Sequence, residues 1–190
     1  MAEGPGHLSF SDLVSSAVSV AGVGPDRYPG TPVRLCFVCL GNICRSPTAE
    51  AVMRRLVAEA GLAAHVEVDS AGTAGWHIGD APDQRSVATA KARGVSIVHR
   101  GRQFAVADLD AFDMVLVMDD DNRANLLQLS RDADHAPKVH YLRSFDAEAH
   151  GSTTIDDPFY SSDAEFVRCF DEIDASCRGL LASLRDEHGW

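Results

Sequence analysis

Residues 39–46, CLGNICRS, constrain the fold of this chain more than any other segment. An apolar run at residues 33–38 precedes the segment, and a helix-like stretch that opens with Pro47 follows it. This order predicts a buried strand, a tight loop and a helix N-terminus. The backbone N–H groups of such a loop form a cradle for an anion, and the helix dipole adds positive potential.

Three side chains of the loop carry its chemistry. Arg45 can hold two oxygens of a phosphate group with its planar fork of donors. The positive potential of the cradle favours a thiolate at Cys39. Ser46 can donate its hydroxyl to that thiolate, and it is also suited to cap the helix. We therefore expect Cys39 to attack a bound phosphoryl group while Arg45 stabilises the charge of the transition state.

The other residues of the loop are expected to contact the substrate: Leu40, Gly41, Asn42, Ile43 and Cys44. Among them, Asn42 tolerates the left-handed backbone that a tight loop requires. A CxxC pair, Cys36 and Cys39, might suggest zinc, but residues three apart on a strand face opposite sides. Because no second pair stands at ligand spacing, we expect no metal site.

Two segments of the chain resemble a known family. CLGNICRSP resembles the first signature of the low-molecular-weight protein tyrosine phosphatases, and residues 157–160, DPFY, resemble the second. Shorter matching segments lie between them and begin at Asp69, Trp76, His99, Met118 and Leu142. The resemblance covers residues 33–187. It implies one α/β domain at residues 33–190: a four-stranded parallel sheet of order 2-1-3-4, helices on both faces, and a phosphate-binding loop after the first strand.

Asp157 is the expected general acid. A tyrosyl group leaves poorly unless it is protonated, and the same carboxylate can then activate the water that hydrolyses a phosphocysteine intermediate. Pro158 restricts the residue before it to an extended conformation, which fixes the aim of the carboxylate. Asp156 lies next to it, and we favour Asp157 over Asp156.

Aromatic residues are expected to form the walls of the substrate slot. Trp76 lies in a glycine-flanked loop, where a large ring is more often functional, and Tyr160 follows the proposed acid. Apolar stacking against these rings would select aryl phosphates. Where the family commonly has two tyrosines after Asp-Pro, this chain has Phe159 and then Tyr160.

The resemblance also implies contacts around the loop. In the family, a network that includes Asn42, Ser70 and His99 braces the loop. We interpret His99 as a supporting residue and not as an acid or base. The resemblance further implies that Cys44 lies close enough to Cys39 to trap it as a disulfide after oxidation.

Hydrophobic periodicity predicts alternating strands and helices. Strands are expected at residues 33–39, 65–69, 114–118 and 139–142, and helices at residues 47–60, 83–93, 119–129 and 163–185. Such alternation is typical of a parallel sheet with helical crossovers. Residues 1–32 are expected to form a flexible tail with a possible short helix at 12–20.

The composition excludes several classes of function. The chain has 190 residues, which suits one domain, and its net charge of −11 disfavours nucleic acid as a partner. No apolar run approaches the roughly 20 residues that span a membrane. Five cysteines and an acidic start favour free thiols and a cytoplasmic location. We expect no cofactor, phosphotyrosine proteins as partners, inorganic phosphate or vanadate as inhibitors, and a monomer or weak dimer.

Three other functions compete with a tyrosine phosphatase. A protein arginine phosphatase shares the scaffold but has Thr where this chain has Ile43, whose side chain we expect to project toward the mouth of the pocket. An arsenate reductase needs further cysteines in mid-chain, and none lies between Cys44 and Cys169. A silent phosphotyrosine-binding module is disfavoured because the expected nucleophile, arginine and acid are all present.

Overall fold

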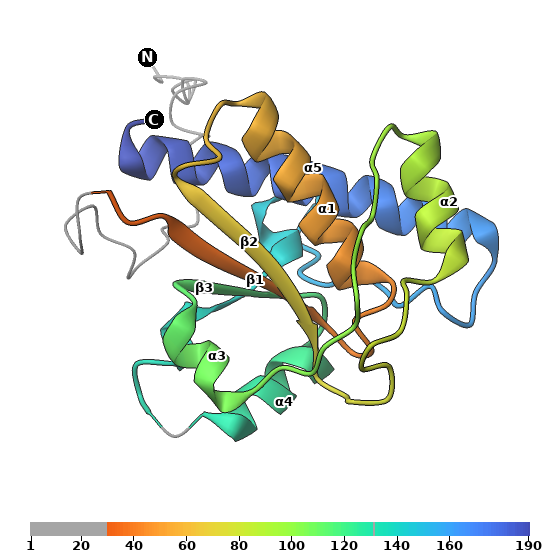
Figure 1. Cartoon of the computed structure of the whole chain (residues 1–190), viewed down its shortest axis with the longest axis horizontal. Coiled ribbons are helices and arrows are strands. Elements are labelled where there is room, and N and C mark those ends of the chain that lie inside the picture. Colours follow the sequence, from red (N-terminus) through yellow and green to blue (C-terminus); the bar gives the residue numbers. More distant parts are fainter. Residues whose placement is uncertain (1–29, 131) are drawn as a thin grey trace, which may run out of the picture.

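A computed structural model of the chain describes residues 30–130 and 132–190 (Figure 1), so the possible helix at residues 12–20 lies outside the described part. Its strands and helices follow one another in this order: β1 (Val33–Cys39), α1 (Arg45–Glu59), β2 (Val66–Gly72), α2 (Gln84–Ala92), α3 (Val106–Ala111), β3 (Met114–Val117), α4 (Asp120–Leu129), β4 (Val139–Tyr141) and α5 (Asp163–His188). Short 3-10 helices at Ala136–Lys138 and Leu142–Phe145 flank β4.

The four strands form one parallel sheet in the order β2-β1-β3-β4, which confirms the predicted topology. β1 lies in the centre, and its last residue, Cys39, pairs with Gly72 at the end of β2. In parallel sheets, ligands bind beyond the carboxyl ends of the strands, where the chain order reverses. The loop after β1 lies at this point.

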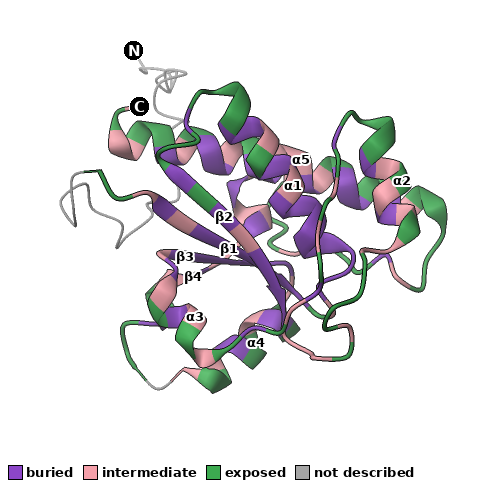
Figure 2. Ribbon diagram, in the orientation of Figure 1, coloured by how far each residue is buried: buried purple, intermediate pink, exposed green. Residues whose placement is uncertain are grey.

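Helices cover both faces of the sheet, with α1, α2 and α5 on one side and α3 and α4 on the other (Figure 1). Alternate residues of β1 face these two layers. Leu35, Phe37 and Cys39 belong to the core under α1 and α5, whereas Cys36 and Val38 pack with α3 and α4. Figure 2 shows the strands buried through most of their length. The prediction that Cys36 and Cys39 face opposite sides is confirmed.

Three differences from the predicted helices exceed one residue. α1 begins two residues early, at Arg45, because Cys44 already serves as its N-cap. The six-residue α3 was not predicted; the Asp108 carboxylate accepts a hydrogen bond from the Ala105 N–H at 2.7 Å, which closes the first turn. α5 continues three residues further, to His188.

Two helices are terminated by glycine, as predicted. Gly61 follows α1 with a φ of +72°, and Gly94 follows α2 with a φ of +73°. Residues with side chains rarely adopt this conformation. Within residues 30–130 and 132–190, no helix is both long and apolar enough to cross a membrane, and no group of three or more His, Cys, Asp or Glu side chains is arranged to hold a metal ion.

Candidate active site

The loop between β1 and α1 has unpartnered backbone donors. The N–H groups of Gly41, Asn42, Ile43 and Cys44 donate to no other described residue, although Gly41 is the only one of these residues that is not buried. α1 has no side-chain cap and no acidic residue in its first turn. Buried N–H groups normally have partners, and a helix N-terminus favours anions. The geometry of the loop is therefore suited to binding an anion.

The end of β2 holds this loop in place. The N–H groups of Thr73 and Ala74 donate to the carbonyls of Cys39 and Leu40, each at 2.9 Å. A Cβ atom added to Gly72 would lie 2.9 Å from the Leu40 carbonyl oxygen. Only glycine therefore allows β2 to approach the loop this closely.

A chain of side-chain contacts leads from the loop to the Cys39 sulfur. The Ser46 Oγ lies 3.1 Å from the Cys39 Sγ, and it accepts a hydrogen bond from the Asn42 Nδ2 at 2.9 Å. All three side chains are buried. The prediction that Ser46 caps the helix is wrong, because Cys44 is the N-cap and Ser46 is the second residue of α1. Its hydroxyl is thereby free to face the sulfur.

The structure brings together the three residues of the predicted bracing network. Asn42 has a φ of +55°. Its Oδ1 lies 2.8 Å from the His99 Nε2 and accepts a hydrogen bond of the same length from the Arg102 N–H. Its Nδ2 donates to the Ser70 Oγ at 3.0 Å. The Asn42 amide therefore fixes the loop through contacts with two other segments of the chain.

Glu50, which the sequence interpretation missed, completes the network from α1. Its Oε2 accepts a hydrogen bond from the Ser70 hydroxyl at 2.7 Å and lies 3.1 Å from the His99 Nδ1. Burial disfavours the charge of Glu50, but hydrogen bonds from His99 and Ser70 and the nearby Arg54 outweigh it and hold the pKa of Glu50 below its ordinary value. A glutamate on a helix is usually exposed, so the sequence offers little sign of this role.

Arg45 is buried and faces two carboxylates. Its Nη1 donates to the Asp119 Oδ2 at 2.6 Å and to the Ile155 carbonyl at 2.9 Å, and its Nη2 donates to the Asp157 Oδ2 at 2.6 Å. Burial opposes the charge of Arg45, but the negative groups of Cys39, Asp157 and Asp119 raise its pKa above the ordinary value. Its buried Nε has no partner among the described residues. That N–H is available to an oxygen of a bound anion.

The two neighbouring aspartates near the C-terminus have different surroundings. Asp157 accepts hydrogen bonds from Arg45 and from the Phe159 N–H, the latter at 3.1 Å. Asp156 instead accepts a hydrogen bond from Arg168 at 3.1 Å, at the protein surface. The structure therefore brings Asp157, and not Asp156, to the loop.

Asp119 also reaches the site, and it belongs to the matching segment that begins at Met118. It caps α4, accepting a hydrogen bond from the Asn122 N–H at 2.7 Å, while its other oxygen holds Arg45. It stands two residues after β3, at the carboxyl edge of the sheet. That position is the sequence signal that could have identified it.

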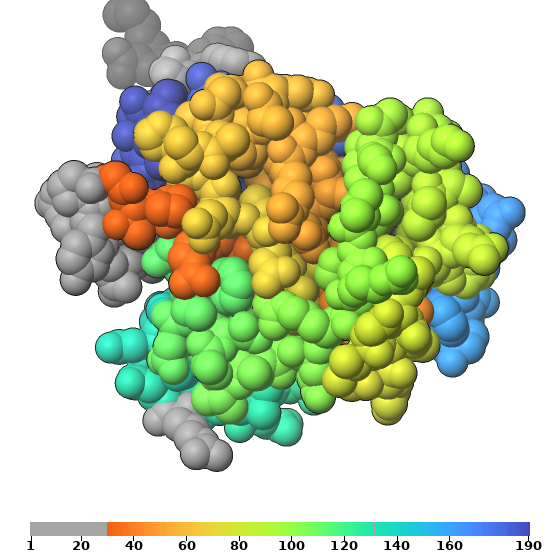
Figure 3. Space-filling model, viewed as in Figure 1, coloured from red at the N-terminus to blue at the C-terminus, as the bar shows by residue number. Residues whose placement is uncertain are grey.

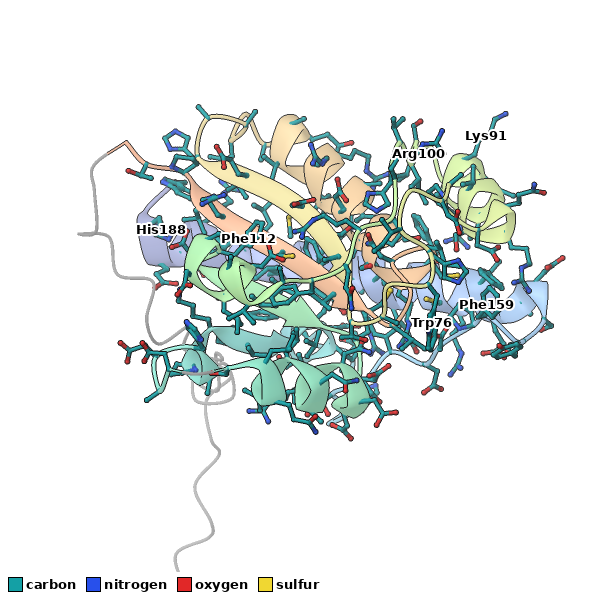
Figure 4. All side chains as sticks on the ribbon, turned by 60° about the horizontal axis from the view of Figure 1, so that its bottom comes forward. Trp76, Lys91, Arg100, Phe112, Phe159 and His188 are labelled. Carbon is teal, nitrogen blue, oxygen red and sulfur yellow. The ribbon has the colours of Figure 1, made fainter. Side chains whose placement is uncertain are left out.

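A hollow of about 90 Å³ opens above the loop. Its walls are formed by the loop and two other segments: Cys39, Leu40, Gly41, Ile43, Cys44, Trp76, His77, Asp157, Phe159 and Tyr160. Trp76 and Tyr160 are largely exposed at the rim, as expected of slot walls. Figure 4 shows Trp76 and Phe159 at the same end of the molecule. His77 and Phe159 are wall residues that the sequence interpretation did not assign.

Ile43 lines this hollow but does not project freely from the loop. Only 9% of its surface is exposed, and it packs with Phe159 and Phe166. The guanidinium of Arg85 lies 4.3 Å from the centre of the Phe166 ring and donates to the Phe159 carbonyl at 3.0 Å. Ile43 therefore forms part of the wall of the hollow, and the Phe159 and Phe166 rings cover most of its side chain.

Cys44 lines the hollow as a buried thiol. Burial raises the pKa of Cys44 to about 12, and the charges of Asp83 and Cys39 add to the effect. Cys44 is therefore protonated at neutral pH. The other cysteines, apart from Cys39, are buried in the two core layers and are not part of the hollow.

A cysteine that faces an anion cradle, with an arginine and a carboxylate beside it, defines a thiol-dependent phosphatase. The sequence profile of the family described as low molecular weight phosphotyrosine protein phosphatase matches residues 34–189. The chain belongs to this family.

Known proteins of similar sequence or structure are also phosphatases. A low molecular weight protein-tyrosine-phosphatase from Streptomyces coelicolor is 43% identical over 155 residues, which is 81% of this chain and 94% of that protein. The crystal structure of a protein tyrosine phosphatase from Entamoeba histolytica has a TM-score of 0.77 and 34% identity, covering 81% of this chain and 97% of that one. An arginine phosphatase from Drosophila has a TM-score of 0.73 and 30% identity, covering 80% and 97%.

Proposed function

We propose that this protein hydrolyses phosphotyrosine in other proteins through a phosphocysteine intermediate. The observation that carries the proposal is the set of four loop amides without partners, which surrounds the end of β1 where Cys39 stands. An anion bound there would satisfy these donors and the buried Nε of Arg45. Membership of the family supports the same reaction.

In the first step, the Cys39 thiolate attacks phosphorus in line with the leaving oxygen. The S–P bond forms, the P–O bond to the tyrosyl group breaks, and Asp157 transfers its proton to the departing oxygen. The loop amides and Arg45 hold the other oxygens, where negative charge develops. For this transfer, the Asp157 carboxylate must break its hydrogen bond with Arg45 and turn toward the departing oxygen.

In the second step, water attacks the phosphocysteine while Asp157 takes a proton from it. The S–P bond breaks, the electron pair returns to the sulfur, and inorganic phosphate is released. The Ser46 hydroxyl, 3.1 Å from the Cys39 Sγ, stabilises the returning thiolate. Inorganic phosphate and vanadate would inhibit by occupying the same cradle.

Aromatic side chains supply the preference for an aryl phosphate. Trp76, Phe159 and Tyr160 line the hollow, and the Phe159 and Tyr160 rings meet edge to face with their centres 4.9 Å apart. A phenyl ring bound between Trp76 and this aromatic pair would bury apolar surface on both of its faces. The five cysteines are free, which favours a reducing compartment such as the cytoplasm.

Phosphoarginine is the second candidate substrate, because the chain resembles an arginine phosphatase in structure. The apolar wall at Ile43 argues against it. A guanidinium carries several N–H donors, and leaving one buried without a partner costs roughly 1–3 kcal/mol.

Purified protein and p-nitrophenyl phosphate test the proposal. Turnover should be unaffected by EDTA, because Arg45 and the loop amides supply the positive field, and it should be blocked by vanadate. Cys39→Ser should abolish turnover, while calorimetry should still detect phosphate binding. If Cys39→Ser retains more than a small fraction of the activity, another group is the nucleophile.

A further inference from the structure

Residues 95–100 form an extended segment at the surface, outside the active-site hollow. They follow α2 and run between α1 and α2 (Figure 1), and Figure 3 shows them at the molecular surface. Exposed residues alternate with covered ones, the exposed residues being Ser96, Val98 and Arg100. A period of two is typical of a strand with one face turned inward.

The backbone of this segment has no partner. Among the described residues, no hydrogen bond involves the backbone N–H or C=O groups of residues 96–100. Both ends are anchored, since the Val95 N–H donates to the Ala90 carbonyl and the Gly101 N–H donates to the Asp80 carbonyl. A fixed, extended backbone with free donors and acceptors is equivalent to the edge of a sheet.

Two hollows flank the segment. One of about 530 Å³ lies against α1 and is lined by Ala51, Arg54 and Arg55, and the other, of about 690 Å³, lies against the start of α2. The second is mostly apolar and is lined by Ala81, Pro82, Gln84, Val87 and Ala88 together with residues 97–100. Neither hollow shares a lining residue with the active-site hollow. Each offers space for the side chains of an added strand.

The charges around the segment favour an acidic partner. Arg54 and Arg55 line the first hollow and Arg100 lines the second, whereas the only carboxylate that lines either one is the buried Glu50. Arg54 pairs with Glu50 and Arg55 pairs with Asp174, but Arg100 has no ion pair among the described residues.

A further lysine extends this basic surface. Figure 4 shows Lys91 of α2 on the same side of the molecule as Arg100. The whole chain has a net charge of −11, whereas Lys91 and Arg100 add positive charge to this surface. Charge complementarity across an interface favours partners of opposite sign.

We propose that residues 96–100 dock an extended acidic peptide of a partner protein, which pairs with the free backbone and places its carboxylates near Arg100 and Arg54. Strand addition of this kind gains affinity from main-chain hydrogen bonds and specificity from side-chain pockets. The covered face of the segment presents His99, which contacts Asn42 of the phosphate loop at 2.8 Å. A docked peptide would therefore contact the segment that carries His99, and His99 supports that loop.

Fluorescence anisotropy with the full-length protein tests the proposal. The probe is a labelled nonapeptide of alternating Val and Glu, without phosphate. Two matched peptides carry Lys in place of Glu, or N-methyl groups on alternate backbone amides. We expect saturable binding of the Glu peptide and at least about tenfold weaker binding of both matched peptides, since charge and main-chain pairing are each required. Equal binding of either matched peptide would overturn the proposal.

Paired variants locate the site on the protein. Val98→Pro removes one free N–H group, and Val98→Ala keeps it; Arg100→Glu reverses the charge, and Arg100→Lys keeps it. Binding should be lost in the first member of each pair and retained in the second, with circular dichroism confirming that all four are folded. Saturating vanadate should leave binding unchanged. Full displacement of the peptide by vanadate would mean that it occupies the catalytic hollow instead.

Discussion

The guanidinium of Arg45 and the carboxylate of Asp157 lie 2.6 Å apart across the phosphate loop. Arg45, which is proposed to bind phosphate, is thus paired with Asp157, which is proposed to protonate the leaving oxygen. An incoming phosphate competes with Asp157 for the same Nη2 donor. We expect bound phosphate to release Asp157, which can then face the leaving group.

The first prediction concerns this competition. Asp157→Ala should lower kcat for phenyl phosphates with basic leaving groups by about 10²–10⁴-fold, because the proton donor is lost. It should also lower the inhibition constant of inorganic phosphate, because Arg45 loses a competing carboxylate. Steady-state kinetics over a series of leaving groups measures both effects.

Asp156→Ala is the matched control, because Asp156 pairs with Arg168 at the surface. Asp156→Ala should change neither kcat nor the inhibition constant of inorganic phosphate substantially. The loss in Asp157→Ala should shrink for activated leaving groups, which depart without a proton. A loss that is independent of the leaving group would contradict the acid role.

The second prediction concerns Glu50 and pH. Its pKa is lowered by folding, so its contribution to stability is fully present above the ordinary value of about 4.5 and is lost as the pH falls through the lower folded-state value. Glu50→Gln should remove this dependence and destabilise the protein at neutral pH by about 1–3 kcal/mol, because the partners Ser70 and His99 lose a charged acceptor. Urea unfolding at pH values from 7 to 3 measures the free energy of unfolding of the wild type and of Glu50→Gln.

Glu59→Gln provides the control for that series. Glu59 ends the same helix but is exposed, and its nearest contact is a 3.7 Å ion pair with Arg55. Exposed pairs of this kind contribute little. The pH dependence of Glu59→Gln should therefore match that of the wild type, and a wild-type profile in Glu50→Gln would exclude the proposed role of Glu50.

The third prediction concerns oxidation. Peroxide should inactivate the protein reversibly through a Cys39–Cys44 disulfide, because both sulfurs line one hollow and a neighbouring thiol stops oxidation at a reversible stage. Cys44→Ser should make the inactivation irreversible. Peptide mapping after oxidation, followed by recovery of activity with dithiothreitol, measures this.

Cys36→Ser serves as the control for oxidation. Cys36 faces the opposite layer of the core, so this variant should still recover its activity. Detection of a Cys36–Cys39 bond in the wild type would refute the assignment of Cys44 as the partner.

The fourth prediction concerns substrate choice. The wild type should prefer phosphotyrosine peptides to phosphoarginine peptides by at least about tenfold in kcat/KM, because the wall formed by Ile43 and Phe159 offers no hydrogen-bond acceptor. Ile43→Thr should narrow the gap. Ile43→Val, which keeps the wall apolar, should not. Faster hydrolysis of phosphoarginine by the wild type would exclude the tyrosine preference while leaving the Cys39 mechanism intact.

Local sequence patterns determined the sheet, most of the helices and the phosphate loop. Strands such as β3 are continuous apolar runs, and Gly94 stands just after the end of α2, so propensity and burial point to the same structure. The cysteine and arginine of the loop could be identified because they stand within a few residues of each other. The weakly patterned α3 was missed, since only six residues form it and its first turn is closed by Asp108.

The tertiary structure added Asp119 and Glu50 to the side chains that reach the loop, whereas Asp157, Ser70 and His99 were expected there from the family resemblance. Asp119 and Asp157 converge on Arg45 from segments that lie 74 and 112 residues away along the chain. Glu50 supports Asn42 only through Ser70 and His99. No local pattern encodes the contact between Glu50 and His99, because it depends on the order of the strands and on which of their ends meet. The sequence thus predicted the nucleophile, the arginine and the acid, whereas the supporting carboxylates of Asp119 and Glu50 became evident only once the distant segments were folded together.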